Sequence, residues 1–267
     1  MVKKPVITLL TDFGLKDSYV AEMKAVILSI CPKASIVDIS HDVEPYNIRM
    51  AAYLLARSVK FFPKGTVHVA VVDPTVGSSR RPIIVEAKNA FLVGPDNGVL
   101  MFAAEKLGLK SVYKIENKDF MLPNISKTFH GRDIFSPIAA YLSLGMSPSS
   151  LGEKIQDFIV LKLFKVNIAD DEVRGSIVHI DSFGNIITCI EKEHLDNIGI
   201  GYGDTLDVVL GDNTMRIKLL PAYGYVKPGE FLAVINSEGF FEIAANMSNA
   251  ALKLGVKVGD PVIIRKR

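Results

Sequence analysis

The chain has 267 residues, of which 49% are hydrophobic and 22% are charged. A net charge of +2 excludes a strongly basic surface for nucleic acid, and the apolar content is too high for a disordered chain. Two cysteines are too few for a disulfide framework or a four-ligand zinc site. The apolar runs are only strand-sized and the N-terminus lacks a signal-peptide core, so we expect a cytoplasmic protein with no membrane partner.

The first 150 residues alternate strand-like and helix-like segments. An unbroken apolar run at 6–10 predicts a strand covered on both faces, and apolar residues at three- and four-residue spacing predict a helix over 20–31. We expect Asn47 to cap the second helix and Pro137 to distort the last one. Further strands are predicted at 35–39, 66–72, 82–87 and 90–93, and further helices at 47–59, 98–106 and 132–144. This alternation is typical of an α/β domain with a mostly parallel, helix-covered sheet.

The pattern changes after residues 145–150, which are rich in glycine, proline and serine. Short strand-like runs follow, separated by turn residues and by one short helical piece at 192–197. The runs lie at 173–180, 186–190, 205–210, 214–219, 231–235, 240–244 and 261–264. The sequence therefore predicts an α/β domain over 1–150 and an all-β, barrel-like domain over 151–267.

Charged residues follow two of the predicted parallel strands. Asp12 comes directly after the first strand and Asp73 directly after the third, and ligands of open parallel sheets gather at the carboxyl ends of the strands. His130 stands just before the last predicted helix of this domain. A P-loop, a dinucleotide-binding glycine motif and a nucleophile elbow are all absent, so the pattern favours a nucleoside or another small polar ligand over nucleotide phosphates.

Eight ordered motifs carry a resemblance that spans nearly the whole chain. They are Thr11-Asp12-Phe13-Gly14-x-x-Asp17, Ile30-Cys31-Pro32 with Val37-Asp38-Ile39-Ser40-His41, Phe61-Phe62-Pro63-x-Gly65-Thr66-Val67, Asp73-Pro74-x-Val76-Gly77-x-x-Arg80, Gly94-Pro95-Asp96-Asn97-Gly98, Phe129-His130-Gly131-Arg132-Asp133, Ile180-Asp181-x-Phe183-Gly184-Asn185 and Asn236-Ser237-x-Gly239. Together they resemble the S-adenosyl-L-methionine (SAM) hydroxide adenosyltransferase family, relatives of the fluorinase and chlorinase enzymes.

The resemblance implies a reaction in which SAM and water give adenosine and methionine, with the (R)-sulfonium epimer as a substrate preferred by some members. It implies no cofactor and no metal, since SAM is itself the substrate. It also implies a homotrimer whose sites lie between the N-terminal domain of one subunit and the C-terminal domain of its neighbour.

Asp73, Arg80 and His130 resemble a triad that activates water. His130 or Asp73 would accept the proton, while Arg80 holds the developing hydroxide and keeps Asp73 ionised. The resemblance also places the substrate: Asp12 and Tyr46 at the ribose, Asp17, Asp181 and Ser237 at the methionine, and Asn185, Tyr223, Asn246 and Met247 at the adenine.

Several positions depart from the relatives. The fluorinase has tyrosine where this chain has Asp73 and a halide-binding threonine where it has Val76, so the differences favour water over halide. Thr75 replaces a usual glycine, so we expect a different turn geometry there. Glu238 and Ala245 replace arginines near the methionine, so we expect the contacts to that part of the substrate to differ from those of the halogenases.

Three alternatives remain open at this stage. They are a halogenase of the same family, a non-catalytic nucleoside-binding module, and a metal-dependent hydrolase. The last would use Asp12, Asp38, His41, Asp73 and His130 as ligands.

Overall fold

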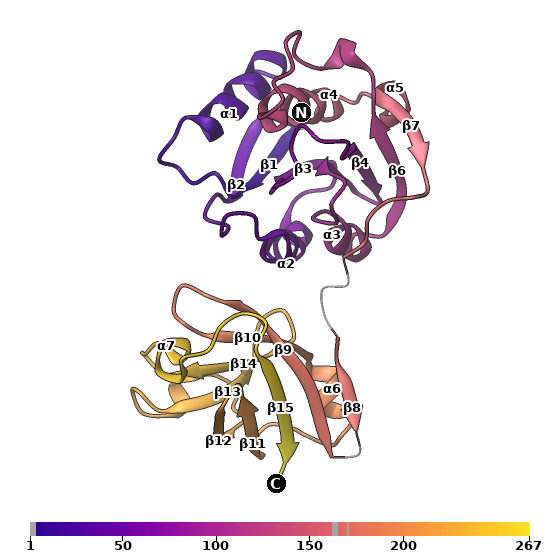
Figure 1. The fold of residues 1–267 in the computed structure, drawn as a ribbon. Coiled ribbons are helices and arrows are strands. Elements are labelled where there is room, and N and C mark those ends of the chain that lie inside the picture. The colour runs from indigo at the N-terminus through magenta and orange to yellow at the C-terminus, as the bar shows by residue number, and fades with distance from the viewer. Residues whose placement is uncertain (1–3, 162–164, 170) are drawn as a thin grey trace. The chain divides into compact units, whose positions relative to one another are not determined.

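The structure is a computed structural model that describes residues 4–161, 165–169 and 171–267 (Figure 1). The chain separates into two compact units, residues 1–161 and 162–267. A domain boundary between residues 150 and 151, in the sense of two parts that fold independently, stays a prediction. Within the described ranges, no helix is both long and apolar enough to cross a membrane.

The first unit is built on one seven-stranded sheet with the strand order β2-β1-β3-β5-β4-β6-β7. Its strands are β1 (Val6–Thr11), β2 (Ser35–Ser40), β3 (Thr66–Val71), β4 (Pro82–Ala87), β5 (Ala90–Pro95), β6 (Leu109–Ile115) and β7 (Gly152–Ile155). The four strands β2, β1, β3 and β5 run parallel, whereas β4, β6 and β7 add antiparallel pairings. The carboxyl ends of β1 and β3 are therefore neighbours, with Thr11 beside Val71.

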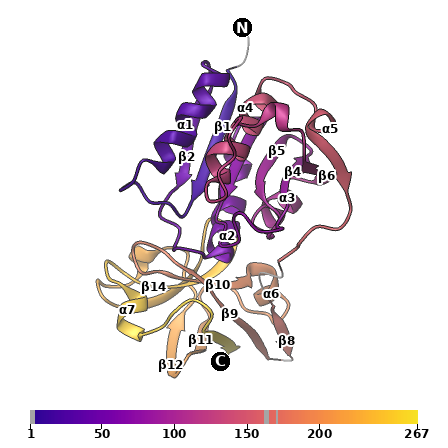
Figure 2. The ribbon, with the colours of Figure 1, turned by 45° about the horizontal axis from the view of Figure 1, so that its top comes forward.

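Helices cover both faces of this sheet, as Figure 1 shows. The helical segments are α1 (Tyr19–Ile30), α2 (Ile48–Ser58), η1 (Val59–Phe61), α3 (Met101–Lys106), η2 (Lys118–Phe120), η3 (Gly131–Phe135), α4 (Ser136–Ser143) and α5 (Pro148–Leu151). Residues of α1 and α4 share one hydrophobic core with the sheet, and residues of α2 and α3 share a second. Figure 2 shows α1 beside the edge strand β2. The predicted α/β class is confirmed, and Asn47 caps α2 by accepting a hydrogen bond from the Met50 amide.

The helix predicted over 132–144 has two parts, a π-helical turn η3 followed by the α-helix α4. Pro137 has no amide hydrogen to donate back along the helix. The carbonyl of Asp133, four residues earlier, instead accepts a hydrogen bond from the Leu122 amide (2.9 Å). The helix can therefore widen before the proline, and His130 stands at the start of the widened turn.

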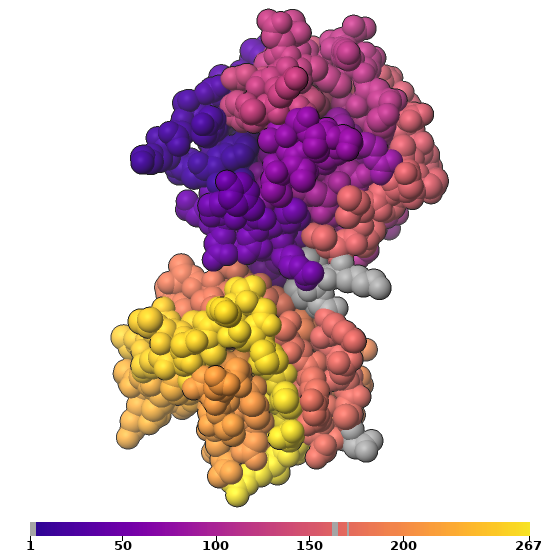
Figure 3. Space-filling view, in the orientation of Figure 1, coloured from indigo at the N-terminus to yellow at the C-terminus, as the bar shows by residue number. Residues whose placement is uncertain are grey.

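The second unit is an antiparallel sheet with the strand order β12-β11-β15-β9-β10-β14-β13, which forms a nearly closed barrel-like fold as predicted. Its strands are β8 (Asn167–Ala169), β9 (Glu172–Ile180), β10 (Ile186–Glu191), β11 (Thr205–Leu210), β12 (Asn213–Lys218), β13 (Phe231–Ile235), β14 (Phe240–Ala245) and β15 (Pro261–Lys266). Three short helices connect them: α6 (Lys192–Asp196), η4 (Tyr223–Tyr225) and α7 (Ala250–Leu254). The α7 segment, yellow in Figure 3, lies at the surface of this unit, and Leu252 within it is 80% exposed.

Three strands were not predicted. β6, β7 and β8 are short or rich in charged residues, and their burial patterns are mostly open. The helix predicted over 98–106 begins only at Met101, because Gly98 adopts a left-handed conformation (φ +90°) that belongs to a turn.

Candidate functional site

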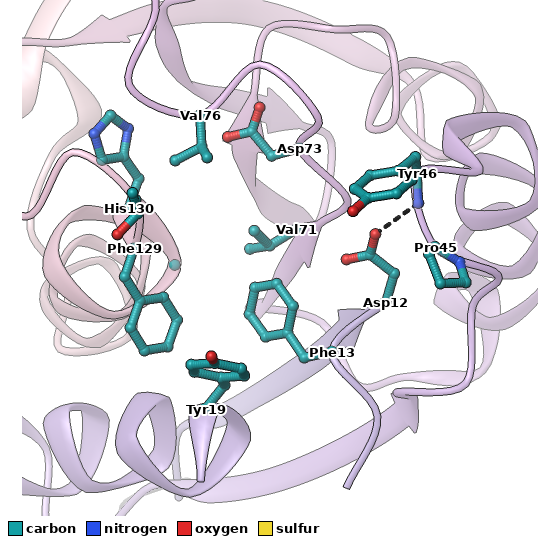
Figure 4. Close-up of a pocket in the computed structure, with 12 residues that line it drawn as sticks. Asp12, Phe13, Tyr19, Pro45, Tyr46, Val71, Asp73, Val76, Phe129 and His130 are labelled. Carbon is teal, nitrogen blue, oxygen red and sulfur yellow. Dashed lines mark hydrogen bonds between the residues drawn. The ribbon is translucent and has the colours of Figure 1, made fainter. Parts of the chain in front are cut away.

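A cavity of about 310 Å³ opens beyond the carboxyl ends of β1 and β3 (Figure 4). It is formed by the chain just after these strands, by the loop before α2 and by the segment that leads into η3. The residues that line it are Asp12, Phe13, Tyr19, Pro45, Tyr46, Val71, Asp73, Val76, Thr128, Phe129, His130 and Gly131. The parallel register that aligns the ends of β1 and β3 thus brings Asp12 and Asp73 to one site, as the sequence predicts.

Asp12 and Tyr46 are joined by a backbone contact. The amide of Tyr46 donates a hydrogen bond to Asp12 Oδ2 (2.8 Å), drawn as a dashed line in Figure 4. Tyr46 has a φ of +68°, a region that few non-glycine residues adopt, so this contact helps to hold a strained turn. The Tyr46 side chain is 72% exposed and leaves the cavity open toward solvent. Asp12 Oδ1 has no hydrogen bond within the described chain and is available to a ligand hydroxyl.

Asp73, Arg80 and His130 form one connected cluster. Arg80 Nε donates to Asp73 Oδ1 (3.2 Å), and Arg80 Nη2 donates to Asp73 Oδ2 and to His130 Nδ1 (2.9 Å). The side chains of Asp73 and Arg80 are each only 5% exposed. A guanidinium that is paired with a carboxylate in two places has a fixed position and orientation. The three residues are in contact, as the sequence predicts, although their catalytic roles stay predictions.

The contact with Arg80 determines which nitrogen of His130 carries its proton. A guanidinium has only donors, so Nδ1 must be the unprotonated acceptor and the hydrogen of the neutral ring lies on Nε2. Burial lowers the pKa of His130, and the charge of Arg80 lowers it further, against smaller opposing effects of Asp73 and Asp133. The site therefore holds a neutral imidazole that can donate a hydrogen bond from Nε2.

One nitrogen of Arg80 remains without a protein partner. Arg80 Nη1 is buried and makes no hydrogen bond within the described residues. The guanidinium carbon lies 5.4 Å from the centre of the Phe135 ring, so one side of the group rests on an aromatic surface. A buried donor without a partner costs about 1–3 kcal/mol. Because Arg80 does not line the cavity, this cost is borne by the fold and is not offset by a group in the described chain.

An aromatic cluster forms another wall of the cavity. Phe13, Tyr19 and Phe129 meet edge to face, with ring centres 5.3 to 5.8 Å apart. Figure 4 shows the three rings together, away from the Asp73 carboxylate. Aromatic faces attract cations such as a sulfonium. The sequence reasoning did not identify this cluster as part of the site, although Phe13 and Phe129 stand directly beside the predicted residues Asp12 and His130.

Arg80 does not itself line the cavity and is joined to it through Asp73 and His130, which do. Asp17 does not line the cavity either. It is exposed in the loop before α1. Val76 does line the cavity and offers no hydroxyl there, whereas the neighbouring Thr75 directs its hydroxyl to Asp73 Oδ1 (3.4 Å).

In the second unit, Asp181 and Asn185 belong to one tight turn. Asp181 Oδ1 accepts hydrogen bonds from the amides of Phe183 and Asn185 (both 2.9 Å), and Asp181 Oδ2 accepts one from Asn185 Nδ2 (3.0 Å). Both carboxylate oxygens of Asp181 are thus engaged within the turn. Asn185 is 8% exposed, whereas the Phe183 ring between them is 76% exposed.

Three further predicted residues of this unit, Asn246, Met247 and Ser237, lie at the two ends of β14. Asn246 and Met247 follow the strand, with Asn246 Nδ2 bonded to the Val226 carbonyl (2.7 Å) and Met247 88% exposed. Ser237 is exposed in the turn that precedes the strand. The six residues of β14 put about 20 Å between these ends.

Tyr223 is anchored to the middle of β14. Its hydroxyl donates to Glu242 Oε1 (2.7 Å), and Asn236 Nδ2 approaches Glu242 Oε2 (3.3 Å). Glu242 is 3% exposed and was missed by the sequence reasoning, because a carboxylate within an apolar strand gives no sign of its partners.

The five residues considered above as metal ligands do not form a metal site in the described part of the chain. His41 Nε2 lies 3.1 Å from Asp38 Oδ1, and its Nδ1 contacts the Thr11 hydroxyl (2.8 Å). Within residues 4–161, 165–169 and 171–267, no group of three or more His, Cys, Asp or Glu side chains is arranged to hold a metal ion.

Comparison with known proteins identifies the family. The sequence model of the SAM hydroxide adenosyltransferase N-terminal domain matches residues 7–152, and that of the C-terminal domain matches residues 175–263. The chain belongs to the SAM hydroxide adenosyltransferase family.

Individual relatives of this family match over almost their full length. The chain is 39% identical to "(R)-S-adenosyl-L-methionine hydrolase" of Methanocaldococcus jannaschii, over 97% of this chain and 95% of that one. It is 26% identical to the "Fluorinase" of Actinopolyspora mzabensis, over 98% of both chains. The crystal structure of an uncharacterized conserved protein from Thermotoga maritima superposes with a TM-score of 0.93 at 40% identity, covering 97% of this chain and 99% of that one.

Proposed function

We propose that this protein hydrolyses SAM to adenosine and methionine, with water as the nucleophile at C5′ of the ribose. The observation that carries the proposal is the Asp73–Arg80–His130 cluster, whose Asp73 and His130 line one cavity together with Asp12. The relatives at 34–39% identity that are named (R)-S-adenosyl-L-methionine hydrolase support it and favour the (R)-sulfonium epimer as substrate. No cofactor enters the reaction.

The bond changes of this reaction make modest demands on the protein. A C5′–O bond forms while the C5′–S bond breaks, and the sulfur keeps the bonding pair and leaves as the neutral thioether of methionine. Because the leaving group is a sulfonium, it needs no proton. The water oxygen becomes strongly acidic as it bonds to carbon, so its proton can pass to a weak base. The task left to the site is to hold water in line with the C–S bond.

We assign the proton acceptor to Asp73 and a donor role to His130. His130 presents Nε2–H while Arg80 occupies Nδ1, so the imidazole can orient the attacking oxygen but has no free lone pair for its proton. The Asp73 carboxylate keeps lone pairs beyond those that Arg80 uses.

The glutamine variant of His130 separates these two roles. The amide nitrogen of His130→Gln reaches about as far as Nε2 and still donates, but it cannot act as a base. We expect His130→Gln to keep at least about tenfold more activity than His130→Ala. Equal loss in the two variants would contradict the donor assignment.

We place the ribose diol at Asp12, whose Oδ1 is unoccupied, with Tyr46 beside it. Two carboxylate oxygens match a cis-diol and repel a phosphate, in agreement with the lack of phosphate-binding motifs. The sulfonium lies toward the aromatic cluster of Phe13, Tyr19 and Phe129. Asp17, Asp181 and Ser237 at the methionine, and Asn185, Tyr223, Asn246 and Met247 at the adenine, remain predictions.

The test uses purified protein, each SAM epimer separately, and water enriched in oxygen-18. The expected products are methionine and adenosine with the heavy isotope in the 5′-hydroxyl, formed faster from the (R)-epimer. Absence of adenosine would refute the proposal, and unlabelled adenosine would refute attack by water at C5′. A main product of 5′-chloro- or 5′-fluoro-adenosine in halide buffer would favour the halogenase alternative. Unreacted substrate bound to the protein would favour the nucleoside-binding module.

We further propose a homotrimer whose sites combine the first unit of one subunit with the second unit of another. Light scattering after gel filtration measures the assembly. If two subunits share each site, a mixture of inactive Asp73→Ala and Asn185→Ala subunits regains activity after exchange, because some sites then carry neither substitution. A mixture that stays inactive, although exchange is shown by mass, would contradict sharing. A cytoplasmic location stays a prediction.

A further inference from the structure

The motif Gly94-Pro95-Asp96-Asn97-Gly98 spans the end of β5 and the turn after it, and none of its residues lines the cavity. Two of its side chains nevertheless reach the segment that carries Asp73 and Arg80. That segment leaves β3 after Val71 and enters β4 at Pro82. The two catalytic groups therefore stand near its opposite ends.

Asp96 holds the Arg80 end. Its Oδ2 accepts hydrogen bonds from Arg81 Nε (3.0 Å) and Nη2 (2.6 Å), and its amide donates to the Arg81 carbonyl (2.9 Å). Arg81 directly follows Arg80, so three contacts fix the backbone from which Arg80 extends. Asp96 is 3% exposed, and a buried carboxylate bonded in this way to a guanidinium resists displacement.

Asn97 holds the Asp73 end. Its Nδ2 donates to the Val72 carbonyl (2.8 Å), directly before Asp73. Its Oδ1 accepts a hydrogen bond from the Val99 amide (3.1 Å), which fixes the orientation of the amide group. Val72 is fully buried, so no water competes for this contact.

We propose that Asp96 and Asn97 are positioning residues that set the distance and angle of the Asp73–Arg80 pair relative to His130. Asp96 bonds Arg81, which is next to Arg80, and Asn97 bonds Val72, which is next to Asp73. Both ends of the segment that carries the two catalytic groups are therefore fixed by the same short turn. This inference rests on the proposed function for its catalytic consequence. A misplacement of about 1 Å can cost about 10²-fold in rate.

The same carboxylate also receives the chain that leaves the first unit. Asp96 Oδ1 accepts a hydrogen bond from the Ile159 amide (2.9 Å), and Arg81 Nη1 donates to Asp157 Oδ1 (3.0 Å). Asp157 is exposed at its side chain (86%), whereas Asp96 is not. The Asp157 contact is therefore peripheral, and its removal leaves the Asp96–Arg81 contact intact.

The test compares Asp96→Asn with two controls. Asp157→Asn removes only the exposed partner of Arg81. Glu172→Gln removes a carboxylate of similar burial (7% exposed) in the second unit, which is paired with two arginines where Asp96 is paired with one. We expect kcat of Asp96→Asn to fall by about tenfold or more with KM changed less than about threefold. Both controls should stay within about twofold of the parent kcat.

The pKa of His130, followed by NMR in carbon-13 histidine-labelled protein without substrate, separates positioning from a merely structural role. Arg80 lowers this pKa, so a displaced Arg80 lets it rise. Loss of the negative charge of Asp96 would by itself lower it. A rise in Asp96→Asn, absent in both controls, supports the proposal. An unchanged or lower pKa overturns it.

Failure of the positioning role can be distinguished from failure of the proposed function. If the parent protein releases adenosine and Asp96→Asn has an unchanged kcat, the positioning role is wrong. If the parent protein releases none, the proposed function fails, while the His130 titration still decides whether Asp96 places Arg80. Should Asp96→Asn not fold, Asn97→Ala removes the other contact without changing charge, and a kcat within twofold of the parent would equally overturn the proposal.

Discussion

Replacement of Gly77 by alanine tests whether the segment that carries Asp73 and Arg80 must lie close to the chain before His130. Gly77 has a φ of +77°, and a Cβ at this position would lie within 3.0 Å of the Lys127 carbonyl oxygen. The backbone at Gly77 and the backbone at Lys127 would have to separate by about 0.8 Å to relieve this contact. The Arg80 Nη2–His130 Nδ1 distance is 2.9 Å, so a shift of that size carries it beyond hydrogen-bond range.

Gly65→Ala is the matched control for this substitution. Gly65 has a φ of +86°, but a Cβ there would meet nothing within 4 Å. Both variants bear the left-handed strain of alanine, about 1–2 kcal/mol, and only Gly77→Ala adds the displacement. We therefore expect both variants to lose thermal stability by circular dichroism, Gly77→Ala more than Gly65→Ala. We expect kcat for adenosine release to fall about 10²-fold more in Gly77→Ala. Equal kcat values in the two variants, at a temperature where both are folded, would refute the reasoning.

The remaining predictions concern the site and its ionisation. Asp73→Ala should lower kcat by about 10²–10⁴-fold with little change in KM, whereas Asp12→Ala should mainly raise KM. If steady-state kinetics show the same defect in both variants, the assignment of Asp73 to proton transfer and Asp12 to ribose binding is wrong. Because the pKa of His130 is lowered from 6.5 and its Nδ1 must stay unprotonated, the acid limb of the kcat profile should have its midpoint below pH 6.5. A midpoint above pH 6.5 would contradict this. Burial lowers the pKa of His68 to about 4, so the unfolded chain binds a proton that the folded chain excludes. The free energy of unfolding should thus decrease by about 2 kcal/mol between pH 7 and pH 5 through this group, measured as the difference in urea unfolding between the parent and His68→Gln.

The fold class and the position of Asp12 and Asp73 at one edge of the sheet could be predicted from the sequence, because both depend on local patterns. Period and turn residues located most strands, and the rule for parallel sheets brought Asp12 and Asp73 to one edge. The strands β6 and β7 were not predicted, because partly exposed strands with charged residues lack a clear alternation of apolar and polar side chains. Their places in the sheet result from tertiary pairing, of β6 with β4 and of the edge strand β7 with β6.

Contacts between distant residues account for what the sequence could not predict within the site. The proton position on His130 follows from Arg80, which lies 50 residues earlier in the chain. The strained φ of Tyr46 is stabilised by Asp12, 34 residues away, and no propensity of tyrosine indicates it. Side-chain identity can nominate such residues, but only their assembled geometry distinguishes a donor from a base.

That geometry also gives a physical reason for water rather than halide as the nucleophile. A halide must be held by donors alone, yet Asp73 brings a carboxylate to the cavity where we propose that the nucleophile is activated, and Val76 contributes only methyl groups. The Asp73–Arg80 pair is neutral as a whole and offers an anion little net attraction to offset its lost hydration. Water can donate to the carboxylate and accept from His130 Nε2, so it satisfies both groups at once. On this proposal, selection among nucleophiles follows from one pairing of opposite charges, and removal of the Asp73 carboxylate slows hydrolysis without creating the donors that a halide requires.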